Sequence, residues 1–138
     1  MPDAKTAVTA DIVPFLRYKD ARAAIDWLEK AFGLETVAVY GEQDGEIGHA
    51  QMRIGNGVIM LSTAKDDGMG MKSPRDLPGV SMGIYVIVPD ADAHYERAKA
   101  AGAQILMAPV DQDYGGRDYT VRDLEGNVWS FGTYRPEA

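Results

Sequence analysis

The side chains of this chain that are suited to acid–base or nucleophilic chemistry are few and scattered. There are two histidines, His49 and His94, and no cysteine, which excludes disulfides, thiolate metal sites and a cysteine nucleophile. Ser130 lies in "VWSF", without the Gly-x-Ser-x-Gly turn that exposes a nucleophilic serine and without an evident histidine–carboxylate partner. The sequence therefore indicates no nucleophilic active site.

Arg117 and His94 each have a structural and a functional interpretation. Arg117 follows two glycines in "YGGR", which predicts a bend at a sheet rim where a guanidinium binds a carboxylate or phosphate. Equally, Arg117 pairs with Asp118 or Asp123 and holds the next hairpin. For His94, beside charged neighbours in a predicted helix, we expect a solvated surface side chain.

These residues lie on the predicted elements of an internal sequence repeat, whose unit spans about half of the chain. Asp20 and Asp90 precede predicted helices over 21–32 and 91–101 as N-caps, and "GNGVIML" and "EGNVWSF" match at the same offset of 70 positions. Each half reads as strand, helix and three strands, and the predicted strands are 11–18, 34–40, 47–54, 57–62, 80–88, 104–107, 116–122 and 127–133.

One domain, residues 1–138, accommodates both halves as modules 11–62 and 80–134. The linker 63–79 is rich in glycine, proline and charge, and we favour an idle, mobile linker over a lid built on Met69 and Met71. The net charge of −7 argues against nucleic acid. No membrane span or signal peptide is evident, so we expect a cytoplasmic protein.

Two tandem βαβββ modules that end in the hairpin "DLEGNVWSFGTY" resemble the vicinal oxygen chelate superfamily. Its members include glyoxalase I, extradiol dioxygenases, fosfomycin-resistance enzymes and bleomycin resistance proteins. "GHAQMRIGNGVIMLS" and "DYGGRDYTVRDLEGNVWSFGTY" look most like its glyoxalase-like branch. The resemblance implies an α+β fold whose curled mixed sheet surrounds a cavity, and a homodimer.

The resemblance also implies where a metal would be bound in this fold. The four ligand positions of the metal-dependent members fall here on Val13, Met60, Gly83 and Ser130. Valine and glycine offer no donor atom, and one hydroxyl with one thioether does not hold a divalent metal. We therefore expect no metal and no other cofactor.

Strand alternation extends these four positions to a predicted cavity wall of mixed apolar and polar character, as in small-molecule pockets. In the last strand, Trp129 and Phe131 point the other way, into the core. The ligand-binding residues predicted from the sequence are Val13, Phe15, His49, Gln51, Met60, Gly83, Tyr85, Arg117, Tyr119 and Ser130.

Three functional hypotheses follow. The first, which we favour, is a metal-free binding protein that sequesters an aromatic or amphipathic small molecule, including a cationic one. The second is a lyase or isomerase that uses tyrosine, histidine or arginine without a metal. The third is a metal-dependent glyoxalase-like enzyme with relocated ligands.

Overall fold

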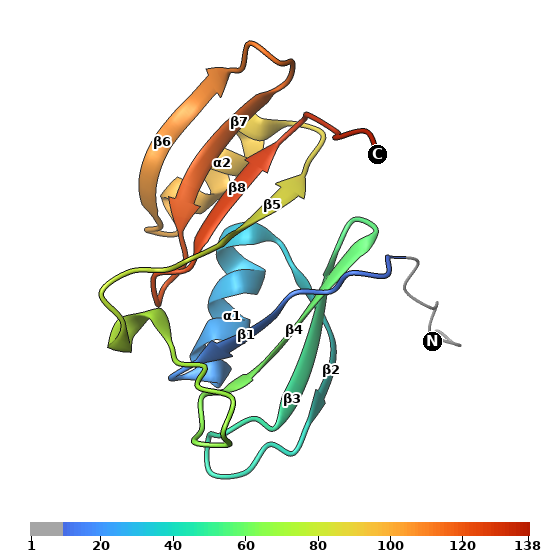
Figure 1. Ribbon diagram of the computed structural model, residues 1–138. Helices are drawn as coiled ribbons and strands as arrows, with labels where there is room; N and C mark the ends of the chain where they lie inside the picture. The colour runs from blue at the N-terminus through green and yellow to red at the C-terminus, as the bar shows by residue number, and fades with distance from the viewer. Residues whose placement is uncertain (1–9) are drawn as a thin grey trace.

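The computed structural model describes residues 10–138 and has the two predicted modules in tandem. The first contains β1 (Phe15–Tyr18), α1 (Ala21–Phe32), β2 (Glu35–Tyr40), β3 (His49–Ile54) and β4 (Gly57–Thr63). The second contains β5 (Gly83–Ile87), α2 (Ala91–Ala100), β6 (Gln104–Asp111), β7 (Arg117–Arg122) and β8 (Val128–Gly132). The predicted α+β class is confirmed (Figure 1).

Each module forms its own four-stranded mixed sheet, with the orders β1-β4-β3-β2 and β5-β8-β7-β6. The first strand of each module pairs in parallel with the last, and the registers are equivalent. Phe15 lies opposite Met60 and Tyr85 lies opposite Ser130. Both partners are displaced by the 70 positions of the sequence repeat.

The helices begin where the sequence predicts. The Asp20 and Asp90 carboxylates accept hydrogen bonds from the backbone N–H groups of Ala23 and Ala93, at 3.0 Å each, and so satisfy free donors of the first turn. The first helix ends at Phe32, and the capping residue Gly33 has a φ of 79°, which favours glycine.

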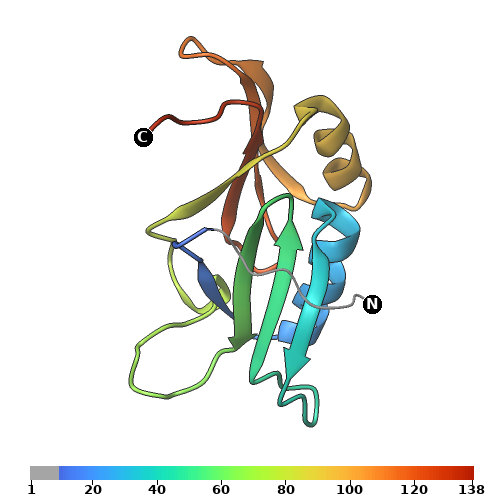
Figure 2. The same cartoon turned by 90° about the vertical axis from the view of Figure 1, so that its right-hand side faces the viewer.

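The two modules share one core. Both helices lie on the same side of the sheets (Figures 1 and 2), and Phe32 at the end of α1 reaches the second module. Its ring centroid lies 5.3 Å from that of Trp129 and 4.7 Å from that of Phe131. Both aromatic residues of β8 are fully buried, which confirms their predicted core role.

The segment between β4 and β5, residues 64–82, crosses the sheet side that faces away from the helices (Figure 2). We call it the connecting segment. It contains the short 3-10 helix η1 (Pro74–Asp76), and the buried Ser73 hydroxyl before that helix donates to the Glu125 carboxylate. Within the described residues, neither helix is long and apolar enough to cross a membrane.

Candidate functional site

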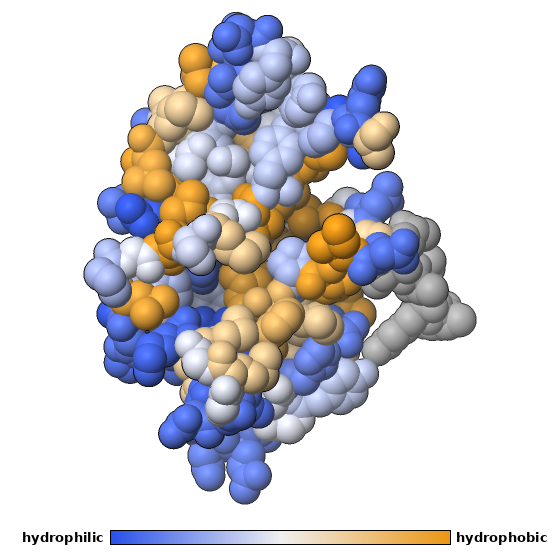
Figure 3. Space-filling view, viewed as in Figure 1, coloured by the Kyte–Doolittle hydropathy of each residue, from blue (hydrophilic) through white to orange (hydrophobic). Residues whose placement is uncertain are grey.

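The central groove lies between β1, the connecting segment and the start of β5, and encloses about 640 Å³. This volume is within the range of pockets that bind small molecules. Apolar side chains gather in the middle of the corresponding face, where the surface is hollowed (Figure 3). The apolar residues that line the groove include Phe15, Met71, Leu77, Val80, Met82 and Ile84.

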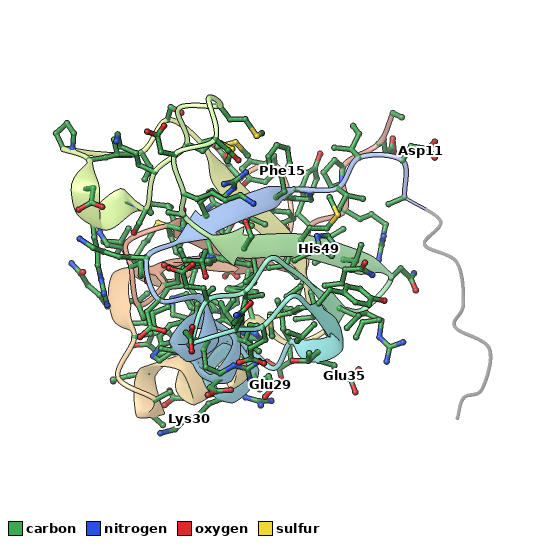
Figure 4. The ribbon with its side chains drawn as sticks, turned by 90° about the horizontal axis from the view of Figure 1, so that it is seen from below. Asp11, Phe15, Glu29, Lys30, Glu35 and His49 are labelled. Atoms are coloured by element: carbon green, nitrogen blue, oxygen red, sulfur yellow. The ribbon has the colours of Figure 1, made fainter. Side chains whose placement is uncertain are left out.

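Strand β1 supplies one wall because its side chains alternate. Leu16 and Tyr18 are buried in the core, so Phe15 and Arg17 project from the opposite face of the sheet. Figure 4 shows Phe15 on the side away from α1, which carries Glu29 and Lys30. Phe15 remains 48% exposed, so its ring is free to contact a ligand.

Arg17 is the buried cation of this wall. Its side chain is only 8% exposed, and its Nη2 donates to Asp67 Oδ2 at 2.8 Å and contacts Met69 Sδ at 3.3 Å. Its Nη1 is buried without a hydrogen-bond partner. The hydrogen bond from Arg17 lowers the pKa of the Asp67 carboxyl, so this carboxylate stays ionised at neutral pH.

The opposite wall is held in place through Glu125. This buried carboxylate accepts from the backbone N–H of Lys19 at 2.7 Å and of Asp20 at 2.9 Å, besides the Ser73 hydroxyl. The hairpin before β8, the entrance to α1 and the connecting segment therefore meet at one acidic side chain. From Met71 onward the connecting segment is thus a wall of the groove, anchored by the buried Ser73, which the prediction of an idle linker did not include.

Of the ten residues predicted to bind ligand, Phe15 alone is among those that line this groove. Val13 precedes β1 and Met60 lies on β4 of the first sheet, while Gly83 and Ser130 lie in the second. Ser130 shares a 2.8 Å hydrogen bond with the Thr120 hydroxyl.

The other predicted wall residues are engaged within their own modules. His49 Nε2 lies 3.0 Å from Gln51 Oε1 on β3. The Tyr85 hydroxyl donates to the backbone carbonyl of Tyr134 at 2.7 Å. The groove residues from Met71 to Met82 were missed because the connecting segment has no strand or helix periodicity from which to infer a facing side.

The predicted orientation of β7 is wrong by one residue. Phe131 and Leu61 are 70 positions apart, but their partners Tyr119 and Ala50 are only 69 apart. Because side chains alternate, a shift of one residue moves a whole strand to the other face. Tyr119 is therefore fully buried against α2. Thr120 instead lies on the face of the sheet on which Tyr119 was predicted, beside Ser130.

Arg117, also on β7, likewise points to the face of the sheet opposite to the predicted one. Its guanidinium binds both Asp92 oxygens at the start of α2, at 3.0 and 3.1 Å, and Asp111 on β6 at 3.2 Å. It therefore does not lie at the rim of the central groove. Neither predicted structural partner, Asp118 or Asp123, is the carboxylate that it binds.

His94 is half-buried and connects the two modules, so the predicted solvated surface position is wrong. Its Nε2 lies 2.7 Å from the backbone carbonyl oxygen of Phe32, and its Nδ1 lies 2.6 Å from the Tyr119 hydroxyl. The ring stacks on Phe131 with a centroid distance of 4.0 Å. Burial lowers the pKa of His94 below its ordinary value.

This shift predicts a pH dependence of stability. The unfolded chain binds a proton at His94 near the ordinary pKa of about 6.5, whereas the folded chain resists it. The contribution is therefore complete above that pH and is lost as the pH falls through the lower folded pKa. We expect urea unfolding midpoints to fall between about pH 7 and pH 5, with a smaller fall in His94→Gln. An identical decline in both proteins would contradict this role.

The four positions that correspond to metal ligands do not fit a divalent metal. Ser130 and Met60 supply the only side-chain donor atoms among them, and Ser130 already bonds to Thr120. Within residues 10–138, no three His, Cys, Asp or Glu side chains are grouped to hold a metal ion.

The chain is similar in sequence to a known protein family and to individual proteins. The family model described as "Glyoxalase/Bleomycin resistance protein/Dioxygenase superfamily" matches residues 9–131. An uncharacterised protein of Mycobacterium bovis is 37% identical over 121 residues, which are 86% of this chain and 80% of that protein.

Two solved structures have similar folds. TioX from Micromonospora sp. ML1 is 30% identical with a TM-score of 0.72, over 94% of this chain and 99% of that chain. Lactoylglutathione lyase from Agrobacterium tumefaciens is 20% identical with a TM-score of 0.62, over 90% and 92%; at this identity the likeness concerns the fold alone.

Proposed function

The chain belongs to the Glyoxalase/Bleomycin resistance protein/Dioxygenase superfamily, and we propose that it is a cytoplasmic protein that binds an aromatic or amphipathic small molecule without a metal. The observation that carries this proposal is the central groove of about 640 Å³ with its predominantly apolar lining. Burying apolar ligand surface there returns roughly 25 cal/mol for each Å² removed from water. A few hundred Å² then support micromolar affinity after the costs of association.

The groove combines adaptable and rigid side chains. Met71 and Met82 are flexible and polarizable, and they adjust to irregular ligand shapes. Phe15 offers a flat ring on which an aromatic ligand stacks. These groups support binding. Among the described residues that line the groove there is no histidine, tyrosine or carboxylate to transfer a proton, which is why we favour a binding protein over a lyase or isomerase.

Binding is tested with phenylnaphthylamine, an uncharged aromatic probe whose fluorescence rises in apolar surroundings. We expect micromolar binding to the intact chain. Met82→Glu places a carboxylate in the apolar lining and is expected to weaken binding about tenfold, which is about 1.4 kcal/mol. Because Met82 is 69% exposed, this change does not disturb the core.

Met107→Glu is the matched control. Met107 lies on β6, is also partly exposed, and does not line the groove, so its replacement should leave the affinity for the probe unchanged. Equal losses in the two variants, or no binding to the unchanged chain, would refute the proposed function.

We further propose that the protein is a homodimer. The sheet side that faces away from the helices is left with exposed apolar residues, among them Phe15, Met82 and Tyr85. Strands β1 and β5 are unpaired edges of their sheets, and edges of this kind are commonly covered by another chain. A second copy on this side would close the mouth of the groove.

Sedimentation equilibrium at micromolar protein concentration is expected to yield twice the 15.0 kDa of one chain. Tyr85→Arg should shift the distribution toward the single chain, because it adds like charges to both sides of a two-fold contact. A single-chain mass throughout the concentration range would refute the dimer.

A further inference from the structure

The guanidinium of Arg17, which lines the central groove, has an unused capacity to bind an oxygen anion. Asp67 reaches only Nη2, with a single oxygen at 2.8 Å, although a carboxylate is able to engage both terminal nitrogens of an arginine at once. Nη1 is left buried with no partner. An unpaired buried donor is costly, and its satisfaction by a ligand is correspondingly favourable.

The charge of the lining favours the same kind of ligand. Arg17 and Lys72 both line the groove, and among the described residues that line it none is acidic. This local charge is opposite to the net charge of −7 of the whole chain. This local charge favours an acidic group on the ligand, whereas the net charge alone would favour a cationic ligand.

The surroundings of Asp67 allow another anion to replace its carboxylate on Arg17. It lies on an exposed turn whose glycines, Gly68 and Gly70, have φ angles of 87° and 72° and no heavy atom within 4 Å of an added Cβ. The turn bonds to itself through the Met69 N–H and the other Asp67 oxygen, at 3.2 Å. The turn therefore contacts Arg17 through Asp67 and Met69, while its two glycines are not packed against other atoms.

We propose that the ligand carries a carboxylate, sulfonate or comparable oxygen anion beside its apolar body, and that this group replaces Asp67 on Arg17. The incoming anion engages Nη1 and Nη2 together, so the exchange converts one charge-assisted hydrogen bond into two. This inference rests on the proposed function, because the apolar body of the ligand must first bind in the groove.

Two fluorescent probes test the anion separately from the apolar body. Anilinonaphthalene sulfonate and phenylnaphthylamine share one aromatic skeleton and differ by the sulfonate. We expect Arg17→Met to weaken binding of the sulfonate about tenfold and to change binding of the uncharged probe less than about twofold. A cooperative urea unfolding transition shows that the variant is folded.

Asp67→Asn provides an independent test with the opposite sign. Removing the competing charge should raise the affinity for the sulfonate severalfold and leave that for the uncharged probe unchanged. The inference is overturned if Arg17→Met affects both probes equally or neither, or if Asp67→Asn weakens sulfonate binding. If the uncharged probe does not bind to the unchanged chain, the proposed function itself fails.

Discussion

Replacing Asp123 with alanine is expected to lower the free energy of unfolding by about 3–5 kcal/mol. Its buried Oδ2 accepts from the Tyr18 hydroxyl at 2.6 Å and from Trp129 Nε1 at 3.1 Å. Its Oδ1 accepts from three backbone N–H groups of the hairpin, at 3.0 Å each. Alanine removes the acceptor of the buried Tyr18 hydroxyl and Trp129 N–H, and the oxygen that the three backbone N–H groups share.

The loss of the acceptor for the Tyr18 hydroxyl adds to this destabilisation. Burial and the neighbouring Asp123 charge raise the pKa of Tyr18 well above its ordinary value, so the phenol stays protonated and continues to need an acceptor. Urea unfolding monitored by tryptophan fluorescence measures the change.

Asp113→Ala, in an exposed turn, is the matched control and should alter stability by less than about 0.5 kcal/mol. Asp123→Asn retains one acceptor oxygen, so its loss of stability is expected to lie between those of Asp123→Ala and Asp113→Ala. A loss for Asp123→Ala no greater than that of the control would show that the hydrogen bonds around Asp123 do not hold the hairpin.

Replacing Phe32 with alanine is expected to cost a similar amount, about 3–5 kcal/mol, because it opens a cavity where the modules join. The Phe32 ring is fully buried and contacts aromatic residues of both modules, with centroid distances of 4.9 Å to Trp27 and 4.7 Å to Phe131. The modules should then unfold with reduced cooperativity, visible as a lower dependence of unfolding on urea concentration.

Phe15→Ala makes the same substitution at an exposed ring and should cost less than about 1 kcal/mol. It is also expected to weaken binding of phenylnaphthylamine, which Phe32→Ala should not do directly. Comparable destabilisation by both variants would mean that the aromatic contacts of Phe32 do not join the modules.

Much of the fold was predictable because its signals are local. The Asp20 and Asp90 caps act on N–H groups three residues away, and the alternation in β4 and β8 places Leu61 and Phe131 in the core. The repeat carries the same information twice, so the pairs Phe15–Met60 and Tyr85–Ser130 have equivalent registers.

The register of β7 was not predictable in this way. A shift of one residue relative to β3 depends on how the hairpin before β8 closes, and Asp123 organises that closure by hydrogen bonds to the hairpin backbone. The sequence repeat does not reveal this shift. The predicted orientations of Tyr119 and Arg117 were therefore opposite to those in the structure. His94 was misplaced for a related reason, since its partners Phe32 and Tyr119 lie on other elements.

The sequence by itself determined two βαβββ modules, their helix starts, the aromatic core of β8 and the absence of donor atoms at two of the four metal positions, because each depends on residue type and short-range spacing. The tertiary structure decided where a ligand has room and charge. The central groove joins β1 to the connecting segment, and Arg17 meets Asp67 from 50 positions away. Such sites arise from packing between segments whose separation in the chain leaves no periodic pattern to read.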